Sequence, residues 1–189
     1  MPDRDEVPFV DLESGEIEYA RYIGERRLRN NEQARLAGYW DGTASSRYGP
    51  HVWGAIGELA AHTLFGLDWH PSIEAPDHGG DVAGWVEVKT REKRLFAPTL
   101  VCGRMGRGIQ EKMQHRPFLL ALVAETRVTF PGWTWGRLLL RPERWGDHFR
   151  TGHPCWLMEA RELRPTRRLM DLVARHVDAM DLPADRSAG

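Results

Sequence analysis

Two carboxylates and a lysine lie close together in one short segment of the chain. Asp81 is followed after five residues by Glu87, and Lys89 comes two positions later. Between residues 85 and 90 apolar and charged side chains alternate, which predicts a β-strand. Because alternate residues of a strand point to the same face, Glu87 and Lys89 share one face and the valines beside them lie on the other.

The position of Asp81 depends on the turn before this strand. A two-residue turn would point the Asp81 side chain away from Glu87. A three-residue loop over 82–84 would pair Asp81 with Trp85 and place both on the face of Glu87. We predict this loop because Gly84 would occupy its third position, which favours the left-handed conformation.

Carboxylates that converge in this way repel each other unless a cation lies between them. Hard oxygen ligands with open positions suit Mg²⁺ or Mn²⁺. The hairpin is therefore predicted to hold a divalent cation between Asp81 and Glu87.

The pattern Asp81-x5-Glu87-x-Lys89 resembles the motif of the PD-(D/E)XK nuclease superfamily, the restriction-endonuclease-like fold. The upstream sequence Gly-Ala-Ile-Gly-Glu-Leu-Ala resembles the first helix of many members, in which a glutamate, here Glu58, points into the same site. The order of helix, hairpin and Glu-x-Lys strand also agrees.

This resemblance covers roughly residues 45–125. The interval between Asp81 and the next acid is shorter than in many members. Asp77 is an alternative first acid, but Asp81 is preferred because it adjoins the strand.

The resemblance implies an α/β fold with a mixed central β-sheet flanked by helices and an α-β-β-β-α-β core. It also implies a deoxyribonuclease, most simply an endonuclease, that depends on Mg²⁺ or Mn²⁺. Asp81, Glu87 and the main-chain carbonyl of Val88 would hold the ion, and Glu58 would support its shell or a second ion. Lys89 would position the attacking water and stabilise the transition state. DNA as the substrate follows from the resemblance and not from the spacing.

Several residues near the motif are candidates for contacts with DNA. A glycine-rich loop over 103–108 carries two of them, and it lacks the Gly-Lys-Ser/Thr ending of a nucleotide-triphosphate loop. The alternative is that these residues belong to a solvated turn and a plain connecting loop. The candidates are Trp85, Arg91, Lys93, Arg94, Arg104 and Arg107. The resemblance also implies that Gln110 would contact the site, as a glutamine does in some relatives.

The composition is that of one soluble domain. The chain has 189 residues and a formal net charge of −1, so any grip on DNA must come from local clusters of charge. The two cysteines are far apart in sequence, which excludes a zinc ribbon. With no signal-peptide pattern and no apolar run long enough for a bilayer, we expect a cytoplasmic protein without membrane contact. Cutting both DNA strands often calls for a homodimer, whereas cutting one strand does not, so the sequence leaves the oligomeric state open.

The periodicity predicts the elements around the motif, with loose ends at 1–14 and 181–189. Arginines on the first helix, Arg27 among them, are expected mainly to face solvent. Gly54 and Gly57 are expected to let the second helix lie close to the sheet. The predicted helices are 16–39, 51–65 (ended by Gly66), 109–115 and one from Pro165, and the further strands are 118–123, 127–130, 133–140 and 155–160, with a turn at 131–133.

Two other interpretations stay open. The first is a catalytically silent member of the same fold that binds nucleic acid or assembles with other proteins. The second is a Zn²⁺ or Ni²⁺ site made by His70, Asp77 and His78, although no regular ligand spacing supports it.

Overall fold

The computed structural model describes residues 7–33, 49–73, 80–93, 98–150 and 152–181. The elements in chain order are β1 Phe9–Asp11, α1 Ser14–Gln33, α2 Pro50–Phe65, β2 Glu87–Glu92, β3 Thr99–Gly103, α3 Arg107–Met113, β4 Pro117–Ala124, β5 Arg127–Trp135, α4 Gly136–Leu139, a 3-10 turn Pro142–Arg144, β6 Trp145–Gly146, β7 Cys155–Glu159, a 3-10 turn Ala160–Glu162 and α5 Thr166–Asp181.

The strands form two sheets, one mixed and one antiparallel. The mixed sheet has the order β1-β5-β4-β2, in which β2 runs parallel to β4 and the other neighbours are antiparallel. The second sheet has the order β3-β7-β6 and is antiparallel throughout. The prediction of a mixed sheet flanked by helices is therefore confirmed at the level of a mixed α/β fold.

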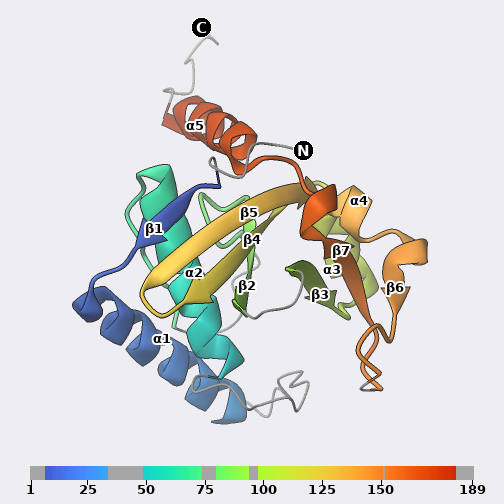
Figure 1. The fold of residues 1–189 in the computed structure, drawn as a ribbon, viewed down its shortest axis with the longest axis horizontal. Coiled ribbons are helices and arrows are strands. Elements are labelled where there is room, and N and C mark those ends of the chain that lie inside the picture. Colours follow the sequence, from blue (N-terminus) through green and yellow to red (C-terminus); the bar gives the residue numbers. More distant parts are fainter. Residues whose placement is uncertain (1–6, 34–48, 74–79, 94–97, 151, 182–189) are drawn as a thin grey trace, which may run out of the picture.

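The helices α2 and α5 cover one face of the mixed sheet, and α1 packs along α2 (Figure 1). The second sheet, with α3 and α4 beside it, lies on the other side of the mixed sheet. The strand β4 is consequently buried on both faces. Its alternate residues enter two separate apolar clusters, Leu119 with α2 and α5, and Phe118 with the second sheet. This explains why β4 reads as an uninterrupted apolar run and confirms the predicted buried strand.

A close approach between α2 and β2 sets the position of the motif strand. A Cβ atom added at Gly57 would overlap the hydroxyl of Thr90, so only glycine fits between the helix and the strand. No atom lies within 4 Å of the corresponding Cβ at Gly54. The close contact expected of the two glycines is confirmed for Gly57 alone.

The predicted turn at 131–133 was wrong, because β5 continues through it from Arg127 to Trp135. The pairing with β4 skips from Leu122–Thr129 to Leu120–Gly132, so Pro131 lies in an irregularity of the ladder. A proline is tolerated there because the missing N–H is not required by the partner strand. The helix α4 then replaces the second half of the predicted strand 133–140.

The predicted loose segment 1–14 was also wrong in part. Residues 9–11 form β1 against β5, and Ser14 begins α1. The other predicted elements are confirmed within a few residues where they are described, and residues 34–39 of the predicted first helix lie outside the described part. Gly66 ends α2 in the left-handed conformation, as expected. The predicted tail includes Asp181, which is the last residue of α5, while residues 182–189 lie outside the described part.

In the described part of the chain, no helix is both long enough and apolar enough to cross a bilayer.

Candidate active site

The hairpin before β2 has a three-residue loop, but its register differs by one residue from the prediction. Val82 pairs with Val86, so the loop is Ala83-Gly84-Trp85 and not 82–84. Ala83 and Gly84 both have positive φ angles, 50° and 63°. Two consecutive left-handed residues give a tight turn that matches the twist of a hairpin, and glycine adopts this conformation without strain.

This register still brings Asp81 to the motif strand. The Val82–Val86 pair is an isolated bridge, so Asp81 reaches the strand through its side chain and not through a continued ladder. The Val88 amide donates a hydrogen bond of 2.7 Å to Asp81 Oδ2. Asp81 is therefore held directly beside the Glu87-Val88-Lys89 segment, as the sequence predicted.

The environment of Asp81 favours its protonated form. Burial raises the pKa of the Asp81 carboxyl to about 7; the charge of Lys89 opposes the rise, and the carboxylates of Glu87 and Glu58 add to it. A carboxyl whose pKa lies near neutrality and whose neighbours carry charges of both signs is typical of functional sites.

Glu87 is the most buried of these acids, with 6% of its surface exposed. Its two oxygens are held by different cations. Lys89 Nζ lies 3.3 Å from Oε2, and Arg116 Nη1 lies 2.8 Å from Oε1. Arg116 directly precedes β4, whose parallel pairing places Phe118 opposite Glu87. The start of one parallel strand thus brings an arginine to the start of the other.

Lys89 is held as a cation. Burial alone would lower the pKa of its ammonium group, but Asp81 and Glu87 outweigh burial and raise it. The ammonium group also lies 5.6 Å from the centre of the Phe118 ring. Lys89 can therefore stabilise negative charge near neutral pH, but it cannot serve there as a general base.

Glu58, on α2, approaches the cluster from the helix side. Its charge contributes to the raised pKa of Asp81. Arg27 Nη1 donates to Glu58 Oε1 at 2.8 Å, and Arg27 Nε donates to the carbonyl of Ser72. The Arg27 side chain is 20% exposed, so the prediction that it faces solvent was wrong. The Glu58 side chain is held by α1 and is not extended into solvent.

The chain itself therefore supplies cations to the acids of this cluster. Repulsion among Asp81, Glu87 and Glu58 does not by itself require an added ion, because Lys89, Arg116 and Arg27 offset it.

The donor set is nevertheless chemically suited to a hard divalent cation, since Asp81 and Glu87 both offer oxygen. Among the described residues, no three His, Cys, Asp or Glu side chains are arranged to hold a metal ion. Main-chain or water oxygens would have to complete the shell around the two carboxylates. His70 is described, but Asp77 and His78 lie outside the described residues, as does the alternative of Asp77 as first acid.

Trp85 does not share the face of the charged residues. It belongs to the loop and not to the strand, so strand alternation does not govern its side chain. Its ring stacks on His176 of α5 at 4.6 Å between centroids and lies 5.8 Å from the ring of Trp135. The predicted placement of Trp85 at the site was wrong.

The candidate DNA contacts fall into two groups. Arg91 shares the face of Glu87 and Lys89, where its Nη1 bonds to Thr99 and its guanidinium group lies over the Phe149 ring. Lys93, just past β2, is exposed, and Arg94 lies outside the described residues. The second group, Arg104 and Arg107, lines a cavity on the second sheet, and Gln110, which the resemblance assigned to the site, lines the same cavity.

Sequence reasoning missed two members of the cluster. Arg116 could have been found from the parallel pairing of 87–92 with the buried run, which places the residue before that run near Glu87. Cys102, on β3, is the other. Burial raises the pKa of its thiol to about 11, with Lys89 opposing and Glu87 adding to the rise. The β3 strand therefore lies over the charged cluster, which no sequence signal indicated.

No protein-family model, curated protein or solved structure matches this chain.

Proposed function

We propose that this protein is a metal-dependent nuclease that hydrolyses DNA phosphodiester bonds. The observation that carries the proposal is the meeting of Asp81, Glu87 and Lys89. The Asp81 carboxyl bonds to the Val88 amide between the other two, and its pKa responds to both of their charges. Two carboxylates that can bind a metal ion, beside a lysine whose pKa is raised, suit phosphoryl chemistry.

The order of elements gives further support. From α2 onward the chain runs through the hairpin arm at Val82, then β2, β3, α3 and β4. With the single-residue bridge at Val82 counted as a strand, this order is similar to the helix, three strands, helix and strand of the restriction-endonuclease-like core. One difference is that β3 pairs with β7 in the second sheet and not within the mixed sheet.

In this proposal the two carboxylates hold Mg²⁺ or Mn²⁺, which when bound supplies a Lewis acid for the phosphoryl oxygen. The Val88 amide holds Asp81 beside Glu87, and the Val88 carbonyl is the candidate third ligand. Lys89 orients the attacking water and stabilises the charge that develops on the phosphorus oxygens. Arg116 fixes the carboxylate of Glu87, and Glu58 stays in the outer shell through its bond to Arg27.

The test is cleavage of supercoiled plasmid and of single-stranded DNA with Mg²⁺ or Mn²⁺, and with EDTA. We expect cleavage that EDTA abolishes. Lys89→Met should remove at least 99% of it, in line with the loss of one charge-stabilising group. Lys112→Met is the matched control, because Lys112 is exposed on α3. Full activity of Lys89→Met, or loss of activity in both variants, would contradict the proposed role of Lys89.

A second candidate function is favoured by the arginines. Because Arg116 and Arg27 already engage Glu87 and Glu58, the cluster is also satisfied as an internal ion-pair network. A catalytically silent module that binds nucleic acid would need nothing more. Wild-type protein that binds DNA but leaves every substrate intact with both metals would support this second function against the first.

A further inference from the structure

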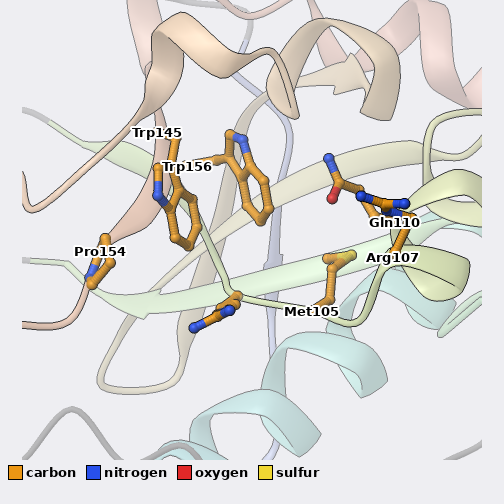
Figure 2. Close-up of a pocket in the computed structure, with 7 residues that line it drawn as sticks. Met105, Arg107, Gln110, Trp145, Pro154 and Trp156 are labelled. Atoms are coloured by element: carbon orange, nitrogen blue, oxygen red, sulfur yellow. The ribbon is translucent and has the colours of Figure 1, made fainter.

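A cavity of about 480 Å³ lies on the second sheet. This volume is in the range of pockets that hold one small ligand, roughly 300–1,000 Å³. Two tryptophans lie along one side, and Met105, Arg107 and Gln110 lie across from them (Figure 2). The lining includes Arg104, Met105, Arg107, Gln110, Trp145 and Trp156.

The two indole rings form the aromatic wall of the cavity. The ring centroids of Trp145 and Trp156 are 4.3 Å apart, with the planes tilted by 53°. Trp156 is buried in β7 and belongs to the apolar cluster that also contains Leu100 and Phe118. Trp145 is only partly buried, so its ring offers the stacking face for a nucleobase of any sequence, and Trp156 supports that ring.

The charge of the cavity favours an anion. Its lining carries two exposed arginines, Arg104 and Arg107, and no carboxylate. Arginine recognises phosphate through paired N–H donors. The Gln110 amide offers both a donor and an acceptor, which suits the polar edge of a base. Aromatic faces, phosphate binders and one amide together match a nucleotide better than a lipid or an apolar metabolite.

The cavity and the charged cluster are joined by two elements. In the second sheet Trp156 is paired with Cys102, and the charges of Lys89 and Glu87 shift the pKa of the Cys102 thiol. The second connecting element is α3. Its residue Gln110 lines the cavity, and Arg116, in the turn after α3, forms the ion pair with Glu87. A polynucleotide could therefore occupy the cavity with one residue while its backbone continues toward the cluster.

We propose that this cavity holds one unpaired nucleotide of the DNA substrate, with its base against Trp145 and Trp156 and its phosphate near Arg104 and Arg107. A base inside a duplex is stacked on both faces, so it cannot enter unless it is flipped out or already single-stranded. The substrate is therefore single-stranded DNA, or a duplex with a frayed or flapped end. This inference rests on the proposed function, because DNA as the polymer comes from there.

The test measures binding by fluorescence anisotropy with the full chain in EDTA, so that no cleavage is needed. The probes are a labelled dT oligonucleotide, a blunt duplex of equal length, and a strand of the same length whose residues are abasic. We expect the dT strand to bind roughly tenfold or more tightly than either of the others, because only it offers free bases for stacking. Equal affinity for normal and abasic strands, or tighter binding of the duplex, would overturn the inference.

Variants locate the binding in the cavity. Trp145→Ala should weaken binding of the dT strand roughly tenfold, and Trp145→Phe should restore most of it. Tyr22→Ala, an exposed aromatic residue on α1, is the control and should have no effect. Arg104→Gln should weaken the dT and abasic strands alike, whereas the exposed Arg168→Gln on α5 should weaken neither. A dT affinity unchanged in both Trp145→Ala and Arg104→Gln would place the binding elsewhere.

These results separate the two proposals. Preference for single strands in EDTA without any metal-dependent cleavage supports the cavity and contradicts the nuclease. Cleavage that depends on Lys89, with no preference for unpaired bases, supports the nuclease and contradicts the cavity.

Discussion

Arg116 Nη1 lies 2.8 Å from Glu87 Oε1, although 29 residues separate them in the chain. The pair joins the residue before β4 to the first residue of β2, and Glu87 is almost fully buried. Removing one partner of a buried ion pair leaves the other charge without compensation, which costs more than the pair contributes.

We therefore expect Arg116→Met to destabilise the protein by about 2–3 kcal/mol, less than for a wholly unpaired charge because Lys89 remains beside Glu87. Urea unfolding followed by tryptophan fluorescence measures the change. The control is Arg127→Met, which breaks the exposed pair with Asp11 and should leave the unfolding midpoint almost unchanged. Equal shifts in the two variants would contradict a buried role for Arg116.

The pKa of Asp81 predicts how stability depends on pH. Burial, as the first cause, raises this pKa from 3.8 to about 7, so the folded protein holds the proton more tightly than the unfolded chain. Protonation therefore favours folding, and this contribution is lost as pH rises from about 4 to about 7. Relative to Asp81→Asn, the wild type should lose up to ~4 kcal/mol across this interval.

Urea unfolding in EDTA at a series of pH values gives this comparison. The Asn side chain keeps a carbonyl oxygen that can accept the bond from the Val88 amide, so the variant removes the titration with little change in shape. Asp171→Asn, on the exposed face of α5, is the control and should follow the wild type. A difference between wild type and Asp81→Asn that does not vary with pH would show that Asp81 titrates normally.

The same titration predicts the metal requirement of the proposed nuclease. A proton and Mg²⁺ compete for the Asp81 carboxylate, so the Mg²⁺ concentration for half-maximal cleavage should fall as pH rises toward 7. The fall should approach roughly tenfold per pH unit below that value and level off above it. Cleavage rates over a grid of pH and Mg²⁺ measure this. A half-maximal concentration that is the same from pH 5.5 to pH 8 would remove Asp81 from the metal site.

The contact between Gly57 and Thr90 predicts a selective effect of two similar substitutions. Gly57→Ala should push α2 away from β2, because the new Cβ would overlap the Thr90 hydroxyl. The expected loss of stability is about 1–3 kcal/mol, as for other overpacked sites. Gly54→Ala, one turn earlier, meets open space and should be neutral or stabilising, since alanine favours a helix over glycine. Thermal unfolding of both variants tests this contact, and a loss in Gly54→Ala equal to that in Gly57→Ala would speak against it.

The local sequence pattern predicted which site residues come together, but it did not predict the exact register of the hairpin. Glu87 and Lys89 share a face because the strand alternates. The loop lies one residue later than predicted, yet Asp81 still lies beside Glu87, because its carboxylate accepts a hydrogen bond from the Val88 amide. Trp85 was misplaced because it fell into the loop, where alternation no longer applies.

Long-range pairing decided the rest. By itself, the sequence determined the motif strand, the buried run of β4 and the last helix, because the spacing of apolar residues predicts each of them. It also determined the end of α2, because Gly66 favours the left-handed conformation. Only the tertiary structure brought Arg116 and Arg27 to the acids and β3 over Lys89, because these contacts depend on which strands pair and which faces pack. The tertiary structure also decided that β5 continues through Pro131, which from the sequence alone predicts a turn. The irregular pairing with β4 at this point accommodates the proline.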